Sequence, residues 1–129
     1  MILIYTILSA ILSTCIEWFR IRLSYGKVSN VNKLWTYTIG VILFAASLSL
    51  SVDYYDDISP LYVLCYAMHF ASVRGVIYDP LLNLLRGLPI DYKSVTTNSI
   101  IDIMIGNKLS FILYRSIYLS IAIITYLLL

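Results

Sequence analysis

Four long apolar stretches constrain this chain more than any other feature of its sequence. They run from about Ile2 to Phe19, Leu34 to Val52, Pro60 to Tyr78 and Leu109 to Leu128. A helix rises about 1.5 Å per residue, so about 20 apolar residues cross the hydrocarbon core of a bilayer. The composition agrees, because 60% of the 129 residues are hydrophobic, only 12% are charged, and the mean hydropathy is +0.87. The sequence therefore predicts a single all-α domain over residues 1–129, an integral membrane bundle of four transmembrane helices.

The third stretch contains the strongest start and stop signals. Ser59-Pro60 and Asp79-Pro80 each combine a capping side chain with a proline at a first helical position, and Gly87 is a typical stop. We therefore expect the third helix to be followed by a short interfacial helix from about Pro80 to Arg86, with its leucines on one arc. In the alternative, one long helix is kinked at Pro80 and has a single polar face. That face would be formed by Cys65, His69, Ser72, Asp79, Asn83 and Arg86.

The charges of the connecting segments predict an orientation. The segment from Arg20 to Lys33 carries only basic charges, and the segment from Asp53 to Ser59 carries only acidic ones. Basic loops stay in the cytoplasm. We therefore expect the Arg20–Lys33 loop and the weakly basic Arg86–Lys108 loop in the cytoplasm, and both termini outside.

Several charged or polar side chains lie in or beside the apolar stretches, where charge is costly and usually has a role. The candidate polar cluster is Glu17, His69, Arg74, Asp79, Asn83, Arg86, Asp102 and Arg115. It is either a polar site or ion path open to the cytoplasm, or a structural ion-pair cluster in which Arg74 extends to the interface. Arg115 needs a carboxylate partner, with Asp79 and Glu17 the leading candidates and Asp102 the third.

His69 lies about midway along the third stretch. It either forms a hydrogen bond between helices or relays protons. Cys65 precedes it by one turn, but two ligands do not make a metal site, and Cys15 and Cys65 are interpreted as buried small hydrophobes. The sequence predicts no metal and no cofactor, and it lacks the common enzyme motifs. A net charge of +2 without a basic run gives no indication of nucleic-acid binding.

The most direct functional hypothesis is a non-enzymatic membrane protein that acts by helix association. Small residues in the second stretch, Gly40, Ala45, Ala46 and Ser49, allow close helix approach. Its expected partners are the lipid bilayer and a second copy of the chain or another membrane protein. One alternative is a channel or transporter subunit that uses the cytoplasmic polar cluster. Another is a lipid-headgroup enzyme that uses Asp79, Asn83 and Arg86.

Three patches together resemble a known group of proteins. They are Arg74-Gly-Val-Ile-Tyr-Asp-Pro-Leu-Leu-Asn-Leu-Leu-Arg-Gly87, Glu17-Trp-Phe-Arg20, and the segment from Thr97 to Asp102. In these patches the chain resembles small multi-span membrane proteins of Bacteroidota and their phages, although it has Asn30 where that group often has histidine. The resemblance implies a bacterial or phage origin and the bacterial cytoplasmic membrane, and it adds a holin-like or envelope-modifying phage protein as an alternative. It implies no catalytic activity.

Overall fold

The computed structural model describes residues 1–23, 30–52, 59–92 and 108–129, and these residues form four helices with no strand. The helices are α1 (Ile2–Leu23), α2 (Asn30–Val52), α3 (Pro60–Leu85) and α5 (Lys108–Leu128). Three of them contain apolar windows long enough to cross a membrane, within Ile2–Leu23, Pro60–Leu85 and Phe111–Leu128. The apolar part found in α2 is shorter, Tyr37–Val52. The prediction of an all-helical chain is confirmed for the described residues, with four helices of which three are long and apolar enough to cross a membrane.

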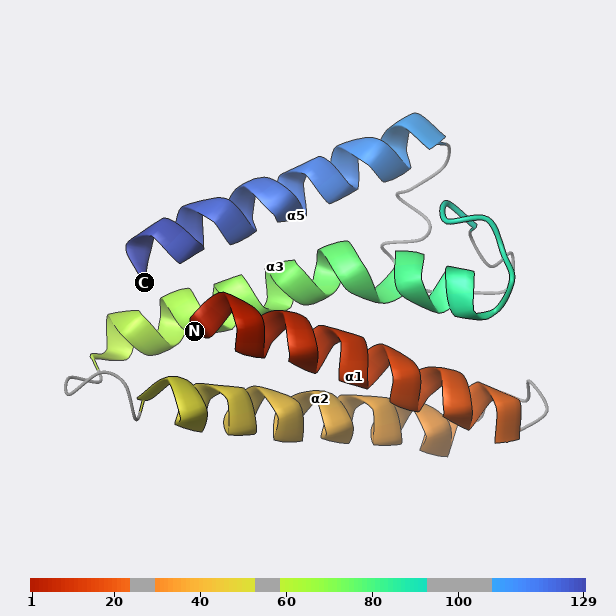
Figure 1. Ribbon diagram of the computed structural model, residues 1–129, viewed down its shortest axis with the longest axis horizontal. Helices are drawn as coiled ribbons and strands as arrows, with labels where there is room; N and C mark the ends of the chain where they lie inside the picture. Colours follow the sequence, from red (N-terminus) through yellow and green to blue (C-terminus); the bar gives the residue numbers. More distant parts are fainter. Residues whose placement is uncertain (24–29, 53–58, 93–107) are drawn as a thin grey trace.

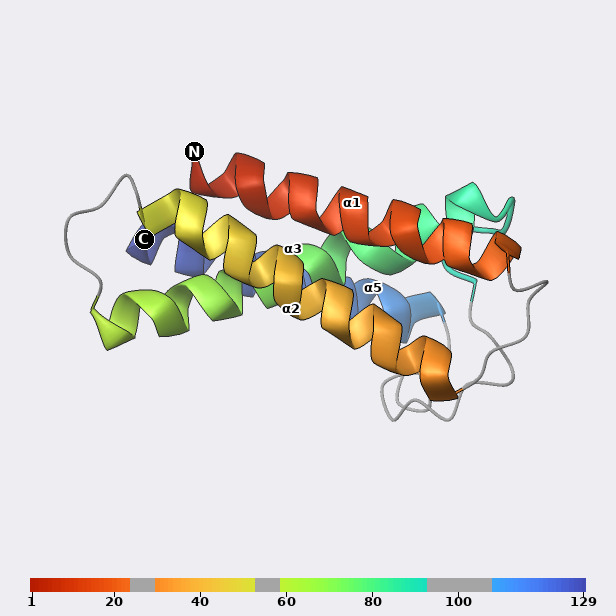
Figure 2. The same cartoon turned by 90° about the horizontal axis from the view of Figure 1, so that it is seen from below.

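The helices lie in the spatial order α2, α1, α3, α5, and helices that follow one another in the sequence run in opposite directions (Figure 1). α3 packs along both α1 and α5, while α2 packs mainly on α1 and only briefly on α3. α1 and α3 are therefore parallel neighbours. Both termini lie at one end of the bundle, and α1 and α3 finish at the other (Figures 1 and 2).

The start and the end of α3 follow the local signals in the sequence. The Ser59 hydroxyl accepts a hydrogen bond from the backbone N–H of Tyr62 at 3.1 Å, which makes Ser59 the N-cap. At the other end Gly87 has φ +71°, and the N–H groups of Gly87 and Leu88 donate to the carbonyls of Leu84 and Asn83. This pair of bonds is the Schellman motif, which favours glycine at the left-handed position.

The expectation of a separate interfacial helix from Pro80 to Arg86 is wrong. α3 continues without interruption from Pro60 to Leu85, with Pro80 inside it. Proline removes one backbone hydrogen bond, but a helix held by neighbours tolerates that loss, and α1 and α5 both pack along α3. Asp79 does not cap a new helix, because its carboxylate pairs with Arg115 of α5. The long-helix alternative is the one observed.

Two apolar clusters hold the helices together. Near the termini, Ile2, Tyr66 and Phe70 are buried, and Phe44 of α2 packs on both aromatic rings at centroid distances of 6.0 and 5.3 Å. The second cluster joins α1, α3 and α5 through small or branched side chains, Ala10, Val73 and Ala122.

Candidate functional site

His69 joins three helices in the interior of the bundle. Its ring is fully buried, and Nδ1 lies 3.0 Å from the carbonyl oxygen of Ala122 and 3.3 Å from the hydroxyl of Thr125, both on α5. A carbonyl can only accept, so Nδ1 carries a proton. Nε2 lies 3.3 Å from the hydroxyl of Thr6 on α1. The geometry is that of a hydrogen-bonded contact between helices, the first of the two roles considered for this residue.

The hydroxyl of Thr6 can serve either protonation state of His69. It donates to the carbonyl of Leu3 at 3.1 Å in one arrangement, and its oxygen can then accept a hydrogen bond from a protonated Nε2. If it turns toward Nε2 instead, it donates to a neutral imidazole. Rotation of the Thr6 hydroxyl therefore allows a hydrogen bond to His69 whether or not Nε2 carries a proton.

Arg115 pairs with Asp79, one of the two leading candidates. Nη2 of Arg115 lies 2.6 Å from Oδ2 of Asp79, and the bond ties α5 to α3. The Arg115 side chain is 13% exposed and the Asp79 side chain 57% exposed, so the carboxylate lies at the edge of the bundle. Nε and Nη1 of Arg115 are buried without a hydrogen-bond partner among the described residues. Its guanidinium instead lies 4.9 Å from the ring centroid of Phe111 and 5.4 Å from that of Tyr114.

Glu17 and Arg74, two further members of the expected polar cluster, have partners of their own. Glu17 is buried and accepts a hydrogen bond from Nε of Arg20 at 2.7 Å, one turn along α1. The guanidinium of Arg74 lies 4.8 Å from the ring centroid of Tyr78, and Glu17 and Asp79 are both within electrostatic range of that tyrosine. The described contacts of Arg74 and Glu17 are therefore with Tyr78 on α3 and with Arg20 on α1.

Asn83 and Arg86 have different roles at the end of α3. The side-chain amide of Asn83 donates to the carbonyls of Ile90 and Tyr92, both at 3.0 Å, and so fastens the following turn to the helix. Both of its N–H bonds are used. Arg86 is exposed and lines a pocket with Trp18 and Arg22. Asp102 lies outside the described residues.

Two contacts of the site have only a weak signal in the sequence. A Cβ added at Gly75 would lie 2.8 Å from the ring of Tyr118, so this glycine lets α5 approach α3 closely. The indole Nε1 of Trp18 donates to the carbonyl of Leu85 at 2.8 Å. A glycine inside an apolar stretch is the only sequence indication of the contact between Gly75 and Tyr118. Nothing in the sequence pairs Trp18 with Leu85.

The chain matches no known protein family, no curated protein and no solved structure in comparisons of sequence and fold. Among the described residues, no group of three or more His, Cys, Asp or Glu side chains could hold a metal ion.

Proposed function

We propose that the chain is a four-span protein of the bacterial cytoplasmic membrane that acts without catalysis, through helix association with a second copy of itself. The distribution of polarity carries this proposal. Small hydroxyl residues, among them Thr6, Ser13, Thr14 and Ser51, are buried, while large apolar side chains cover the outside of all four helices. A water-soluble bundle has the opposite arrangement. The buried hydroxyls donate to carbonyls one turn back on their own helices, so they need no water.

A non-catalytic role is supported by how the polar side chains are used. The headgroup enzyme considered above would need Asp79 and Asn83 to act on a substrate. Asp79 is in an ion pair with Arg115, and both amide protons of Asn83 hold the turn after α3. These groups stabilise the fold, which makes them poor acid–base or phosphate-binding groups.

The outward face of α2 supports self-association. Ala45, Ala46 and Ser49 are exposed on it, whereas Gly40 is turned inward, where a Cβ would lie 2.5 Å from Nη1 of Arg74. α2 packs mainly on α1, so its other side is open to a partner helix. Small residues one turn apart allow two membrane helices to approach closely. A second copy would meet this face with the same residues.

The first test is the mass of the purified protein in mild detergent and in nanodiscs. We expect an oligomer that Ala45→Leu and Ser49→Leu each shift toward the monomer, because leucine holds the two helices apart. Ser120→Leu is the matched control, since Ser120 is equally exposed but lies on α5. A wild-type protein that is strictly monomeric in both media would contradict self-association.

A row of buried polar residues favours a second candidate, a channel or transporter subunit. Thr6, His69 and Thr125 are buried where α1, α3 and α5 meet, and Ser72 of α3 is buried as well. Purified protein in planar bilayers should then conduct ions, and His69→Leu should lower that conductance. Absence of any conductance above that of protein-free bilayers would leave helix association as the better account.

A further inference from the structure

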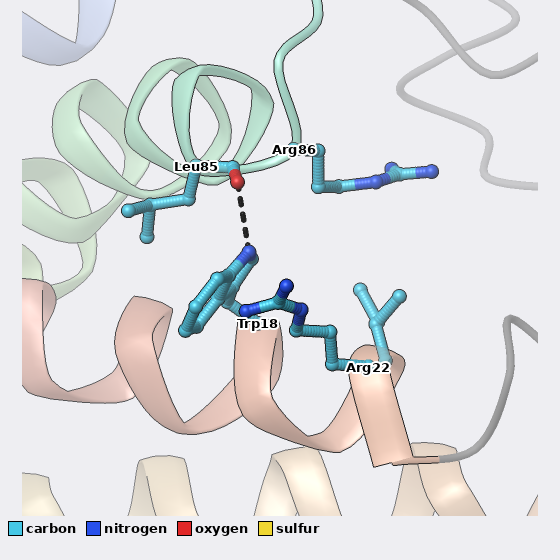
Figure 3. Close-up of a pocket in the computed structure, with 5 residues that line it drawn as sticks. Trp18, Arg22, Leu85 and Arg86 are labelled. Atoms are coloured by element: carbon cyan, nitrogen blue, oxygen red, sulfur yellow. Dashed lines mark hydrogen bonds between the residues drawn. The ribbon is translucent and has the colours of Figure 1, made fainter.

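A pocket of about 370 Å³ opens at the end of the bundle where α1 and α3 finish (Figure 3). α1 contributes Trp18, Ile21 and Arg22, and the end of α3 contributes Leu85 and Arg86. The bond from Trp18 to the carbonyl of Leu85 joins the two walls at 2.8 Å. The pocket therefore combines two guanidinium groups with an indole ring and two aliphatic side chains.

The two arginines at the pocket are available for a ligand. Arg22 lies with its Cζ 5.0 Å from the centroid of the Trp18 ring, and Arg86 is exposed. The ion pairs of the described residues involve other arginines, Arg20 with Glu17 and Arg115 with Asp79. Neither Arg22 nor Arg86 is in an ion pair with a carboxylate of the described residues.

The end of α3 does not repel an anion as strongly as a free helix end would. The last carbonyls of a helix usually carry a partial negative charge because they lack partners. Here each of the last four accepts a hydrogen bond: those of Leu82 and Asn83 from the N–H of Arg86, that of Leu84 from Gly87, and that of Leu85 from Trp18. The full charges of Arg22 and Arg86 therefore dominate the pocket.

We propose that this pocket binds the phosphate group of an anionic membrane lipid. Guanidinium groups match phosphate oxygens with paired hydrogen bonds, and a tryptophan near the end of a span lies at headgroup depth. Ile21 and Leu85 provide an apolar surface for the glycerol and the first acyl carbons. The inference rests on the membrane insertion proposed above and adds a ligand to it. It does not depend on self-association.

The test uses the full chain in phosphatidylcholine nanodiscs with increasing shares of phosphatidylglycerol, and native mass spectrometry to measure how much phosphatidylglycerol stays bound. Arg22→Gln and Arg86→Gln should each weaken phosphatidylglycerol binding about fivefold, the effect of one basic residue at an anionic membrane surface. Lys33→Gln is the control, because it removes the same charge near the start of α2, whereas the described lining of the pocket comes from α1 and the end of α3. Replacing both arginines by lysine should preserve part of the affinity, since charge remains while the paired bonds are lost.

The outcomes separate this inference from the proposed function. If Lys33→Gln weakens phosphatidylglycerol binding as much as either pocket variant does, the attraction is general and the pocket assignment is overturned, although insertion stands. If inorganic phosphate added to pure phosphatidylcholine nanodiscs competes as well as the lipid, the ligand is free phosphate and the lipid assignment fails. A chain that does not enter nanodiscs would overturn both proposals. Thermal unfolding of each variant distinguishes weaker phosphatidylglycerol binding from failure of the variant to fold.

Discussion

At the scale of single residues, Asp79 forms an ion pair with Arg115, whereas the sequence predicted that it caps a helix beginning at Pro80. Arg115 is largely buried, and its guanidinium does not deprotonate, so it depends on a nearby carboxylate. Asp79 lies at the surface of the bundle, where water or headgroups can reach it. Removing Asp79 therefore leaves a buried charge without its partner, whereas removing Arg115 leaves an exposed carboxylate.

We predict that Asp79→Asn and Asp79→Ala lower the free energy of unfolding by similar amounts, about 1–2 kcal/mol after allowance for the exposure of the carboxylate. Either change leaves the buried Arg115 charge without its partner. Arg115→Leu should cost less than either change, because it leaves only an exposed carboxylate. The double variant Asp79→Asn with Arg115→Leu should recover part of the loss. Unfolding by sodium dodecyl sulfate in mixed micelles, followed by circular dichroism, provides the measurement.

The same pair of variants tests the continuity of α3. Asparagine caps helices about as well as aspartate, and alanine does not. If Asp79→Asn lowers the free energy of unfolding only slightly and Asp79→Ala lowers it strongly, Asp79 acts as a cap and the helix breaks at Pro80.

At the scale of secondary-structure elements, α3 is the helix on which the others are arranged. It packs against both α1 and α5, and Gly75 leaves room for the ring of Tyr118 on α5. The ring of Tyr118 covers this glycine, and the Tyr118 hydroxyl accepts a hydrogen bond from Tyr114 at 2.6 Å. The ring is therefore held in place and has little freedom to move aside.

We predict that Gly75→Ala destabilises the bundle by about 1–3 kcal/mol, the usual cost of overpacking. Gly40→Ala is the matched control. Its added methyl group also comes close to a neighbour, at 2.5 Å, but that neighbour is the end of the flexible Arg74 side chain. Arg74 can move, so Gly40→Ala should cost less. Equal losses in thermal stability in detergent would show that α5 does not pack on Gly75 as described.

At the scale of the whole molecule, the four helices alternate in direction, so both termini lie at one end of the bundle (Figure 1). α1 ends and α2 begins at the opposite end, and the sequence there, from Arg20 to Lys33, carries only basic charges. α2 ends and α3 begins at the end with the termini, and the sequence between these two helices contains three aspartates. With the helices crossing a membrane as proposed, the basic and the acidic sequence segments would border opposite sides of it.

We predict that reporters fused after Leu129 or within residues 53–59 are found outside the cytoplasm, and that reporters near Gly26 or Tyr92 are found inside, because basic loops are retained. Paired alkaline phosphatase and fluorescent protein fusions measure this directly. A carboxyl terminus found in the cytoplasm would reverse the orientation or remove one span. Replacing Arg20, Arg22, Lys27 and Lys33 together by glutamine should weaken the preference for one orientation.

The sequence by itself determined the features of this protein that depend on neighbouring residues. Apolar length located the four helices, because crossing a bilayer requires about 20 apolar residues whatever their partners. The Ser59 cap and the Gly87 stop were also predictable, since a hydroxyl that accepts an N–H three residues on, or a left-handed glycine, is a local preference. The need of Arg115 for a carboxylate followed from its charge alone.

Only the tertiary structure decided the features that depend on residues far apart in the chain. Asp79-Pro80 has the local signature of a helix start, yet packing of α3 against α1 and α5 carries the helix through it. The choice of Asp79 over Glu17 for Arg115 depended on which helix face meets α5. One sequence-based alternative gave Asn83 a role at a lipid headgroup, but the turn after α3 brings the carbonyls of Ile90 and Tyr92 within its reach. In each case a contact between separate segments outweighs a local preference, because its energy exceeds the modest cost of breaking a local rule.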